Sequence, residues 1–575
     1  MKIHKRLFIL VLSLVVVFTA GCGRLTESFM EFYDQPRQIV MEEPQEKVDD
    51  RYVITIYSQV SDYFGQQTGW SGKLIEDRLH MKVLIVPFTV EEDTAESEFL
   101  YGNPDMIIFS SYSDAYDMAV KSGELLDLTQ DRLLEEHGDY IFEHFQKNIE
   151  YNKARSGKSG VYGIAGNTSS SEGDHEDFRY TWGIRWDLYE QLGYPEVNNL
   201  KQLTDVMKQM KTICPKDEEG NETYAYSLWS DWDKDMPYCF KSMVEAYYGK
   251  LSMGMGFYDV ETGGYSGCLE DDAYMDSLKF FNNLYRDGLL DPKSKELTEQ
   301  EAVQKILRGS NLCSMVEYAG CVIYNSDEHI SEGKMMCPLV PKDATPLVYG
   351  ISAMGTGPVF SIMENSPHRE KCMELMDYLF SAEGFMEMTY GPKRVTWDYD
   401  SNGNMYLTDF GTEVFQDGKT TMPDEWGKDE HFMDGLFKLG AKTWNIMAKN
   451  PDAGGEVFKK DYWLSNNRTK ISDAFEDWQQ YTGYRMFYDY LDHTSYKIHK
   501  ISFNETGEIT AKLKKDCWNQ VEQDVIEGSW KAVYSRTDEE FEINIQEMKR
   551  NAYLHGYEQC IEWGKDTAER HKEGE

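Results

Sequence analysis

Asp105-Met-Ile-Ile-Phe109, followed at once by Ser110 to Asp114, is the stretch that decides how the first part of the chain folds. The apolar run has the length and composition of a buried strand, and the serines and aspartate after it are suited to begin a helix. Two further runs of this kind precede it, Tyr52-Val-Ile-Thr-Ile-Tyr57 and Lys82-Val-Leu-Ile-Val-Pro87. Strands that alternate with helices at this spacing predict a doubly wound α/β lobe around a parallel sheet.

The remainder of the chain is predicted to be mainly helical. From about Tyr180 onward, apolar residues recur at helical spacing and charged residues occupy the opposite faces. The predicted helices cover Asp187 to Leu192, Leu200 to Lys211, Asp272 to Asp287, Glu299 to Arg308, Arg369 to Phe380 and a large block from Asp429 to the end of the chain. The predicted fold class is therefore α/β with a helix-rich C-terminal extension.

The composition of the 575-residue chain excludes several classes of function. It has 100 acidic and 59 basic side chains and a formal net charge of −41. Binding to nucleic acid or to anionic lipid needs clustered lysine and arginine, so this charge argues against both. The charge also counts mildly against a strongly anionic substrate. Aromatic residues make up 14% of the chain, a share above that of an average soluble domain.

The first residues have the pattern of a secretory signal. Three basic residues among the first six are followed by an apolar run over residues 7–20, which is too short to span a membrane as a helix. Thr19-Ala-Gly-Cys22 resembles the lipobox of bacterial lipoproteins. That resemblance implies a signal peptide over residues 1–21, lipidation of Cys22 and an acidic tether over residues 22–50. The alternative is an ordinary signal peptide followed by an incidental cysteine.

Short motifs along the chain resemble one known family. In chain order they are Asn103-Pro-Asp-Met-Ile-Ile-Phe109, Gly123-Glu-Leu-Leu-Asp-Leu-Thr129, Val161-Tyr-Gly-Ile-Ala165, Trp182-Gly-Ile-Arg-Trp-Asp-Leu-Tyr-Glu-Gln-Leu-Gly193, Leu284-Tyr-Arg-Asp-Gly-Leu-Leu-Asp-Pro292, Phe380-Ser-Ala-Glu-Gly384 and Tyr390-Gly-Pro-Lys-Arg-Val-Thr-Trp397. Together they resemble the extracellular solute-binding proteins of family 1, in particular the large lipoprotein subgroup that serves oligosaccharide ABC importers. The motifs cover nearly the whole chain after the cysteine.

The resemblance implies a type II periplasmic-binding-protein-like fold, with two α/β lobes joined by a hinge. By this pattern the N-terminal lobe holds residues 50–165 and 340–383, and the C-terminal lobe holds residues 166–339 and 384–575. The lobes are expected to close over an oligosaccharide and to hand it to the membrane permease subunits of an ABC transporter. The resemblance also implies a lipid-anchored monomer on the outer face of the cytoplasmic membrane, with no catalytic residues, no cofactor and no nucleic-acid partner.

A sugar site needs flat aromatic platforms beside carboxylates and amides. In the family such contacts come from loops after the first strands, from the start of the second lobe and from a late segment. Carried onto this chain, they point to Ser110, Tyr112, Asp114, Trp182, Arg185, Glu317, Tyr318 and Trp397. Trp229 and Trp232 are added because the polar segment around them gives tryptophan little structural role. Ordinary core packing is the alternative for each tryptophan.

Two acidic stretches raise the question of calcium. Asp398, Asp400, Asn402 and Asp409, with Gly403, follow the ligand spacing of an EF-hand loop except that aspartate replaces the last glutamate. The alternative is a β-hairpin that turns at Asn402-Gly403. The second stretch, residues 217–221, lies where some relatives carry a calcium loop but lacks the repeated Asp/Asn pattern.

Other chemistry receives little support from the sequence. The nine cysteines after Cys22 contain no CxxC pair, although Cys313 and Cys321 could bridge if their strands are adjacent. No HExxH, GxSxG or phosphate-binding loop appears in a suitable context. Two other functions stay open: a lipid-anchored glycan-degrading enzyme, whose carboxylate pair would be hard to recognise among 100 acidic residues, and a polysaccharide adhesin.

Overall fold

The structure is a computed structural model that describes residues 50–89, 103–427, 429–465, 472–502 and 509–574. The expected signal peptide, Cys22 and nearly all of the expected tether lie outside these residues. Within the described ranges, no helix combines the length and the apolar character needed to cross a membrane.

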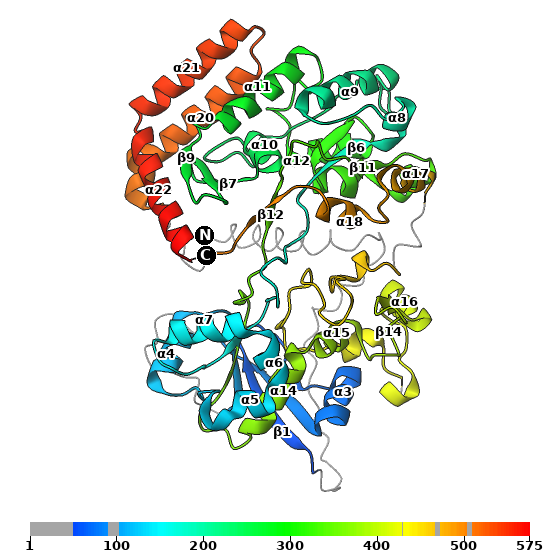
Figure 1. Ribbon diagram of the computed structural model, residues 1–575, viewed down its shortest axis with the longest axis vertical. Helices are drawn as coiled ribbons and strands as arrows, with labels where there is room; N and C mark the ends of the chain where they lie inside the picture. Colours follow the sequence, from blue (N-terminus) through cyan, green and yellow to red (C-terminus); the bar gives the residue numbers. More distant parts are fainter. Residues whose placement is uncertain (1–49, 90–102, 428, 466–471, 503–508, 575) are drawn as a thin grey trace, which may run out of the picture. The chain divides into compact units, whose positions relative to one another are not determined.

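A six-stranded sheet forms the centre of the first lobe, with the strand order β2-β3-β1-β4-β13-β5 (Figure 1). Its strands are β1 (Tyr52–Ser58), β2 (Gly65–Gln66), β3 (Met81–Pro87), β4 (Met106–Phe109), β5 (Ile164–Ala165) and β13 (Val359–Ile362). β1 runs parallel to β3 and β4, whereas β13 runs antiparallel to β4 and β5. β2 only extends one edge. When β2 is set aside, β1, β3, β4 and β5 are strands 1 to 4 in chain order, and β13, which enters the sheet much later in the chain, is called n. Across the sheet the strand order is then 2-1-3-n-4. This is the order of a type II periplasmic-binding-protein-like sheet, and it confirms the predicted fold class.

The sheet is buried on both faces at β4, whereas β1 and β3 alternate buried residues with half-buried or exposed ones. Ile54, Ile56 and Ile108 are fully buried. The helices around the sheet are α3 (Gly69–Leu79), α4 (Asp114–Ser122), α5 (Leu133–His137), α6 (Asp139–His144), α7 (Gln146–Ser156) and α14 (Arg369–Phe380). The start of α4 is capped as predicted, because the side chain of Ser113 accepts a hydrogen bond from the amide of Tyr116.

The second lobe has a three-stranded antiparallel sheet with the order β10-β6-β11. Its strands are β6 (Tyr180–Arg185), β10 (Cys313–Val316) and β11 (Met336–Pro338), and a smaller sheet contains β7 (Lys250–Met253), β8 (Gly256–Asp259) and β9 (Tyr265–Gly267). A parallel pair joins β12 (Leu347–Tyr349) to β16 (Lys497–His499). The helices between these strands are α8 (Trp186–Gln191), α9 (Leu200–Ile213), α10 (Tyr238–Tyr248), α11 (Asp272–Arg286), α12 (Glu299–Leu307), η3 (Tyr318–Val322) and α13 (Asp327–Ser331).

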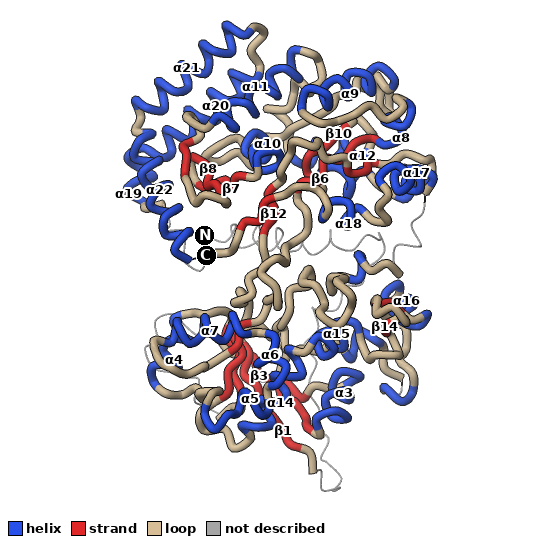
Figure 2. The backbone as a smooth tube through the Cα atoms, viewed as in Figure 1, coloured by secondary structure: helices blue, strands red, loops and turns tan. Residues whose placement is uncertain are grey.

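The C-terminal part of the chain is helical, as Figure 2 shows. Its helices are α17 (Asp473–Thr482), α18 (Phe487–Asp492), α19 (Ala511–Leu513), η8 (Lys514–Trp518), α20 (Asn519–Val533), α21 (Asp538–Leu554) and α22 (Tyr557–Gly574). α20 and α21 pack against each other, and α20 also packs against α11. The predicted helix-rich extension is therefore part of the second lobe's packing, but its α-helices begin at Asp473 and not at Asp429, since the described residues between 429 and 465 form only short 3-10 turns and loops.

The chain that follows α14 packs against α3. It contains α15 (Ala382–Tyr390), β14 (Trp397–Tyr399), β15 (Met405–Leu407), α16 (Asp409–Gln416), η4 (Asp424–Trp426) and η5 (Phe432–Gly435). Trp70 of α3 stacks on Phe432 with ring centroids 5.4 Å apart, and its Nε1 donates a hydrogen bond to the Phe432 carbonyl at 2.8 Å. Arg78 of α3 forms ion pairs with Glu383 and Glu387 of α15. These contacts hold the segment beside the first sheet.

Three stretches of backbone are hydrogen-bonded to one another where the chain passes between the lobes. We call residues 166–176, 349–358 and 442–445 the connecting band. Asn167 donates its amide hydrogen to the Lys442 carbonyl at 3.0 Å, and Asn445 donates to the Thr168 carbonyl at 2.9 Å. Farther along, Glu176 donates to the Tyr349 carbonyl at 2.7 Å and Ile351 donates to the Asp174 carbonyl at 2.9 Å. Main-chain hydrogen bonds therefore join two of the crossings, residues 166–176 and 349–358, and tie the first of them to residues 442–445, which pack on α14 of the first lobe.

Candidate functional site

The carboxyl ends of β1 and β4 lie side by side, as the sheet order requires. Ser110 follows β4, is exposed, and donates its amide hydrogen at 2.8 Å to Oε1 of Gln59, which follows β1. Asp114 is also exposed and begins α4. Tyr112 is half-buried, and its ring packs edge-on against Tyr116. Ser110 and Asp114 thus offer polar groups to solvent, whereas Tyr112 mainly supports α4.

A later segment covers the end of β1. The Ser58 hydroxyl donates to the Leu439 carbonyl at 3.1 Å, and the Ser61 hydroxyl donates to the Lys438 carbonyl at 2.7 Å. Ser58 is completely buried by this contact. The strand end that the sequence offered as a ligand position is therefore occupied by the chain itself, and Ser110 remains accessible beside it.

Trp182 and Arg185 of β6 are buried, and their polar groups are bonded to other parts of the protein. Trp182 is 3% exposed and its Nε1 donates a hydrogen bond to the Ala246 carbonyl at 3.0 Å. Arg185 is 4% exposed and makes two hydrogen bonds, of 2.8 and 2.7 Å, with the carboxylate of Asp187. A sugar ring has no access to either side chain, so we leave both out of the proposed site.

Trp397 of β14 is also a packing residue. It is fully buried, and its Nε1 donates to the Gly391 carbonyl at 2.8 Å. Its ring packs edge-on against Tyr399 with centroids 5.4 Å apart. The alternative interpretation of core packing describes this residue, and we leave it out of the proposed site as well.

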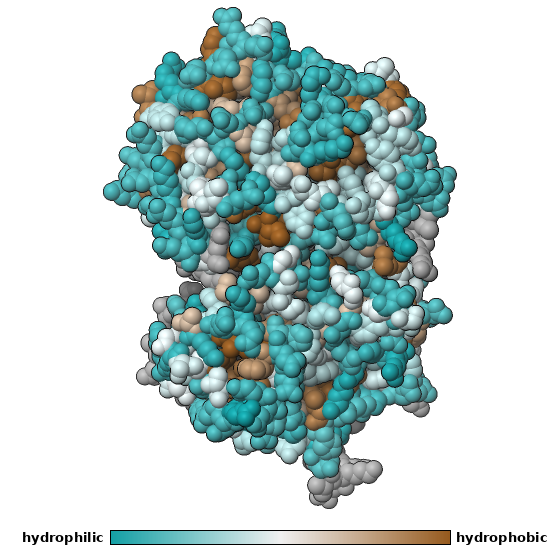
Figure 3. Space-filling view, in the orientation of Figure 1, coloured by the Kyte–Doolittle hydropathy of each residue, from teal (hydrophilic) through white to brown (hydrophobic). Residues whose placement is uncertain are grey.

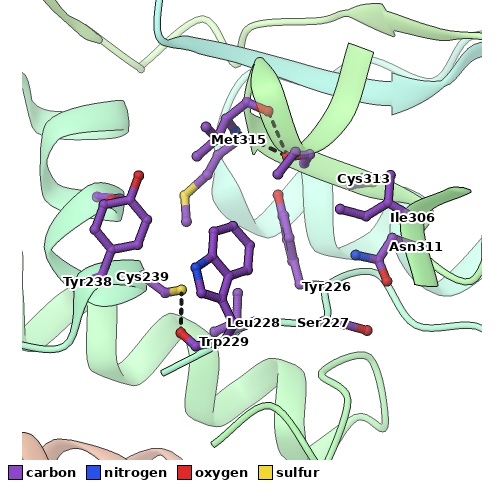
Figure 4. Close-up of a pocket in the computed structure, with 14 residues that line it drawn as sticks. Tyr226, Ser227, Leu228, Trp229, Tyr238, Cys239, Ile306, Asn311, Cys313 and Met315 are labelled. Carbon is purple, nitrogen blue, oxygen red and sulfur yellow. Dashed lines mark hydrogen bonds between the residues drawn. The ribbon is translucent and has the colours of Figure 1, made fainter. Parts of the chain in front are cut away.

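Trp229 and Trp232 form an aromatic cluster with Tyr238 at the start of α10. The ring centroids of Trp232 lie 5.5 Å from Trp229 and 4.9 Å from Tyr238. Trp229 is buried, and Figure 4 shows its indole between Tyr238 and Tyr226, with Met315 beside it. The cavity that these residues line has a volume of about 20 Å³. That volume holds about one water molecule and is too small for a ligand, so the accessible side of the cluster is its outer side, where Trp232 and Tyr238 are half-buried.

Arg179 adds a positive charge beside this cluster. It lies one residue before β6, is exposed, and donates a hydrogen bond of 3.5 Å to the hydroxyl of Tyr349 at the end of β12. Its guanidinium lies 5.8 Å from the centroid of the Tyr349 ring. The buried carboxylate of Glu245 is already satisfied, because it accepts hydrogen bonds from the Tyr180 hydroxyl and the Ser252 amide. Arg179 makes no ion pair with any described residue, so most of its donors are available to a ligand.

Glu317 lies opposite Arg179 across the β6–β10 pair, since the Glu317 amide donates to the Arg179 carbonyl at 2.9 Å. Burial, and the nearby charge of Asp177, raise the pKa of Glu317 to about 7, although Lys459 opposes this shift. Asp177 is ion-paired with Lys459 and accepts a hydrogen bond of 2.5 Å from the Tyr462 hydroxyl. The carboxyl of Glu317 itself has no hydrogen-bond partner among the described side chains.

Tyr318 connects the Glu317 side of this region to the tryptophan segment. Its hydroxyl donates to Oε1 of Glu299 at 3.2 Å, and the Glu299 amide donates to Oδ2 of Asp231 at 2.7 Å. We call Trp232, Tyr238, Tyr318 and Tyr349 the aromatic surface; these four half-buried rings are accompanied by Arg179 and Glu317. Partly open rings beside both donors and acceptors can stack on the apolar face of a sugar and bind its hydroxyls.

The visible surface is mainly polar. Figure 3 shows a mainly hydrophilic face on which apolar residues form only small, separate patches. A chain of net charge −41 presents a negative field to solvent, so an anionic ligand would need strong local compensation.

The segment with EF-hand-like spacing adopts the hairpin alternative. β14 and β15 pair as antiparallel neighbours around the turn. Oδ1 of Asp400 accepts hydrogen bonds from the amides of Asn402 and Asn404 at 2.7 and 2.9 Å, and Asp409 is the first residue of α16. Across the described ranges, no group of three or more His, Cys, Asp or Glu side chains is arranged to hold a metal ion.

The second acidic stretch is also held by internal hydrogen bonds. The carboxylate of Asp217 accepts hydrogen bonds from the Ser310 hydroxyl at 2.6 Å and from the Asn221 amide at 2.7 Å. Burial alone would raise the pKa of Asp217, but these hydrogen bonds bring it below its ordinary value. The loop therefore uses its carboxylate to stabilise its own turn.

Arg179, Asp177 and Tyr349 were missed by the sequence interpretation. Arg179 and Tyr349 are 170 residues apart and meet only because β6 and β12 both leave the connecting band. One signal was available: both lie at the ends of short apolar strands, where a sheet commonly presents its functional side chains.

Comparisons with known proteins show similarity only to solved structures. No family model and no curated protein matches the chain. An N-glycan transport solute binding protein (NgtS) from Streptococcus pneumoniae is 14% identical, with a TM-score of 0.47 over 91% of this chain and 99% of the other. An HMO-binding ABC-transporter-associated solute binding protein from Bifidobacterium longum infantis has the same four values. FusA from S. pneumoniae, in complex with kestose, is 13% identical, with a TM-score of 0.41 over 91% of this chain and 100% of the other. At TM-scores of this size the similarities decide nothing further, and the fold assignment rests on the strand order of the sheet.

Proposed function

We propose that this protein is a lipid-anchored solute-binding protein that captures an oligosaccharide and delivers it to the permease of an ABC transporter. The observation that carries the proposal is the aromatic surface, which lies beside the connecting band of a two-lobe α/β fold. Three features support it: the strand order of the first lobe, the resemblance of the motifs to sugar-binding lipoproteins, and the half-buried rings beside Arg179 and Glu317.

In this proposal the second lobe supplies most of the contact area. Trp232 and Tyr238 stack on the apolar face of a sugar, because a flat ring excludes water from that face and gains dispersion energy. Arg179 and Glu317 bind the hydroxyls at its edge, and Ser110 of the first lobe adds hydrogen bonds when the lobes close.

The test is a thermal-shift panel followed by calorimetry on the protein. The panel includes N-glycan fragments and kestose, the sugars named for the similar structures. A ligand at one hundred times its dissociation constant adds about 2.7 kcal/mol to the free energy of unfolding, which a melting curve resolves readily. If no oligosaccharide of plant, host or fungal origin shifts the melting temperature, the proposed function is wrong.

Anchoring through Cys22 has its own test. We expect the Cys22→Ser variant to appear in the medium or to keep its signal peptide, because a diacylglyceryl group holds a protein on the bilayer far better than a single acyl chain does. The wild-type protein fractionates with membranes in the same experiment. A variant that has lost its signal peptide and still fractionates with membranes as the wild type does would contradict the lipid anchor.

A glycan-degrading enzyme is the second candidate, and one pair of residues favours it. Glu317 has a pKa of about 7, whereas neighbouring Asp177 is held by Lys459 and Tyr462. Glycosidases use a protonated and an ionised carboxyl in different environments of this kind. Incubating the protein with each bound oligosaccharide separates the two functions, since a binding protein leaves the sugar intact. Shortened products that disappear in Glu317→Gln would establish the enzyme.

A further inference from the structure

Two buried thiols meet in the C-terminal helices. Cys517 lies in η8 and Cys560 in the first turn of α22, with their Sγ atoms 3.9 Å apart. They are 3% and 0% exposed. Among the nine described cysteines this is the one sulfur–sulfur contact within hydrogen-bonding distance, and neither Cys313 nor Cys321 has such a neighbour.

The surrounding packing holds the two sulfurs in place. Trp518, next to Cys517, packs edge-on against Trp563 of α22 with centroids 5.2 Å apart. Gly556, just before α22, comes so close that a Cβ atom there would lie 2.8 Å from Cβ of Cys517. Its φ of +99° is a conformation that favours glycine. The turn is thus built to bring the start of α22 onto Cys517.

We propose that Cys517 and Cys560 form a disulfide that ties α22 to the start of α20. The two residues are 43 positions apart, so the bond closes a covalent ring around α20 and α21. Bond formation shortens the distance between the two Sγ atoms from 3.9 Å to about 2.05 Å. The proposal relies on the extracytoplasmic location in the proposed function for its oxidising surroundings, but not on sugar binding.

The oxidant is a low-molecular-weight disulfide or a disulfide-carrying oxidoreductase. One cysteine thiolate attacks the oxidant's disulfide and releases one of its sulfurs as a thiol. The second cysteine thiolate then attacks the mixed disulfide, which forms the Cys517–Cys560 bond and releases the other thiol. The two cysteine protons end on the released thiols, and the oxidant gains two electrons.

The bond is expected to form while the chain folds. In the folded dithiol, burial and the neighbouring Cys517 raise the pKa of Cys560, so little thiolate is present to react. Once formed, the same burial protects the bond from reductants in solution.

Peptide mapping tests the proposal directly. The full-length protein is harvested from the cell surface under thiol-blocking conditions and digested with trypsin. The purified reduced protein, refolded with oxidised and reduced glutathione, forms a second sample that does not depend on export. We expect peptides 516–531 and 551–565 to be joined, two hydrogen atoms lighter than their sum, and separated by reductant.

The matched controls are Cys517→Ser, Cys560→Ser and Cys372→Ser, the last a buried cysteine of α14 without a sulfur neighbour. The joined peptide should vanish in the first two variants and persist in the third. Reductant should lower the melting temperature of the wild type by a few degrees and leave Cys517→Ser unchanged. Recovery of both peptides as blocked free thiols from the refolded wild type would overturn the proposal. A joined peptide without any sugar binding would instead contradict only the proposed function.

Discussion

Trp397 and Trp232 both lie in polar segments of the sequence, but the polar groups around them differ in whether they have hydrogen-bond partners in the fold. The indole N–H of Trp397 is bonded to a backbone carbonyl and its ring is fully enclosed. The indole N–H groups of Trp229 and Trp232 have no hydrogen-bond partner among the described residues, and neither has the Glu317 carboxyl. Folding normally satisfies such groups, so a cluster that leaves several of them open is suited to bind something else.

The largest expected effect distinguishes the two tryptophans by stability. We expect Trp397→Ala to lower the free energy of unfolding by about 3–5 kcal/mol, because it empties a fully buried site and leaves the Gly391 carbonyl without its donor. Sugar affinity of the remaining folded protein should be unchanged. Melting curves and calorimetry on one preparation measure both quantities. A normal melting temperature with lost affinity would place Trp397 in the binding site after all.

The second prediction concerns pH and the open Glu317 carboxyl. Its folded-state pKa of about 7 exceeds its ordinary value of 4.5, so the folded protein binds the proton more tightly than the unfolded chain does. This contribution is fully present below pH 4.5 and is lost as the pH rises through 7. We expect Glu317→Gln to be more stable than wild type at pH 8, by up to about 3 kcal/mol, and equally stable at pH 4.

Urea unfolding of both proteins at several pH values measures that difference. Glu299→Gln is the control, because Glu299 is half-buried at the start of α12 but has a hydroxyl partner in Tyr318. Parallel stability profiles of Glu317→Gln and wild type between pH 4 and 8 would show that the Glu317 carboxyl is not held in a proton-binding environment.

The third prediction addresses affinity. We expect Trp232→Ala to weaken sugar binding by about thirtyfold, or about 2 kcal/mol, with little change in melting temperature, because a half-buried ring loses stacking area but leaves no large cavity. Trp426→Ala is the matched control, since Trp426 is also half-buried but lies in η4 beside α3. Equal losses of sugar affinity in Trp232→Ala and Trp426→Ala would show that Trp232 is not a specific sugar contact, and the site assignment would be wrong.

The smallest effect is expected at the hairpin that carries Trp397. Oδ1 of Asp400 already accepts hydrogen bonds from the backbone amides of Asn402 and Asn404, so this carboxylate stabilises the turn. We therefore expect a calcium chelator to leave the melting temperature unchanged, and Asp400→Ala to lower it only slightly. Stabilisation by added calcium that Asp400→Ala abolishes would restore the metal interpretation.

Much of the fold could be predicted because its first main strands are short apolar runs, of which β4 is buried throughout and β1 and β3 are buried at alternate residues. The three runs that end at Tyr57, Pro87 and Phe109 match β1, β3 and β4 closely. The position of β13 could not be read locally, since it enters the sheet about 250 residues after β4 and its place is set by pairing. The lobe boundaries remain a prediction. Contacts of Trp70 and Arg78 with the chain after α14 lead us to propose that residues 382–440 belong with the first lobe.

The site was only partly predictable for a similar reason. Trp232 was recognised from its polar neighbours, and Glu317 and Tyr318 came from the family resemblance. The sequence could not separate Trp182 from Trp232, because the partner of an indole N–H is a backbone carbonyl that has no sequence signal. Arg179 was missed because its companion Tyr349 comes from another crossing of the band.

The connecting band has a consequence for cleavage by proteases. Because the backbone passes between the lobes three times, one cut in a crossing leaves two intact chains across the junction, and the crossings at residues 166–176 and 349–358 are also hydrogen-bonded to each other. A nicked molecule would run as fragments in denaturing gels but stay whole in native ones. A single scission within one crossing therefore does not separate the two lobes.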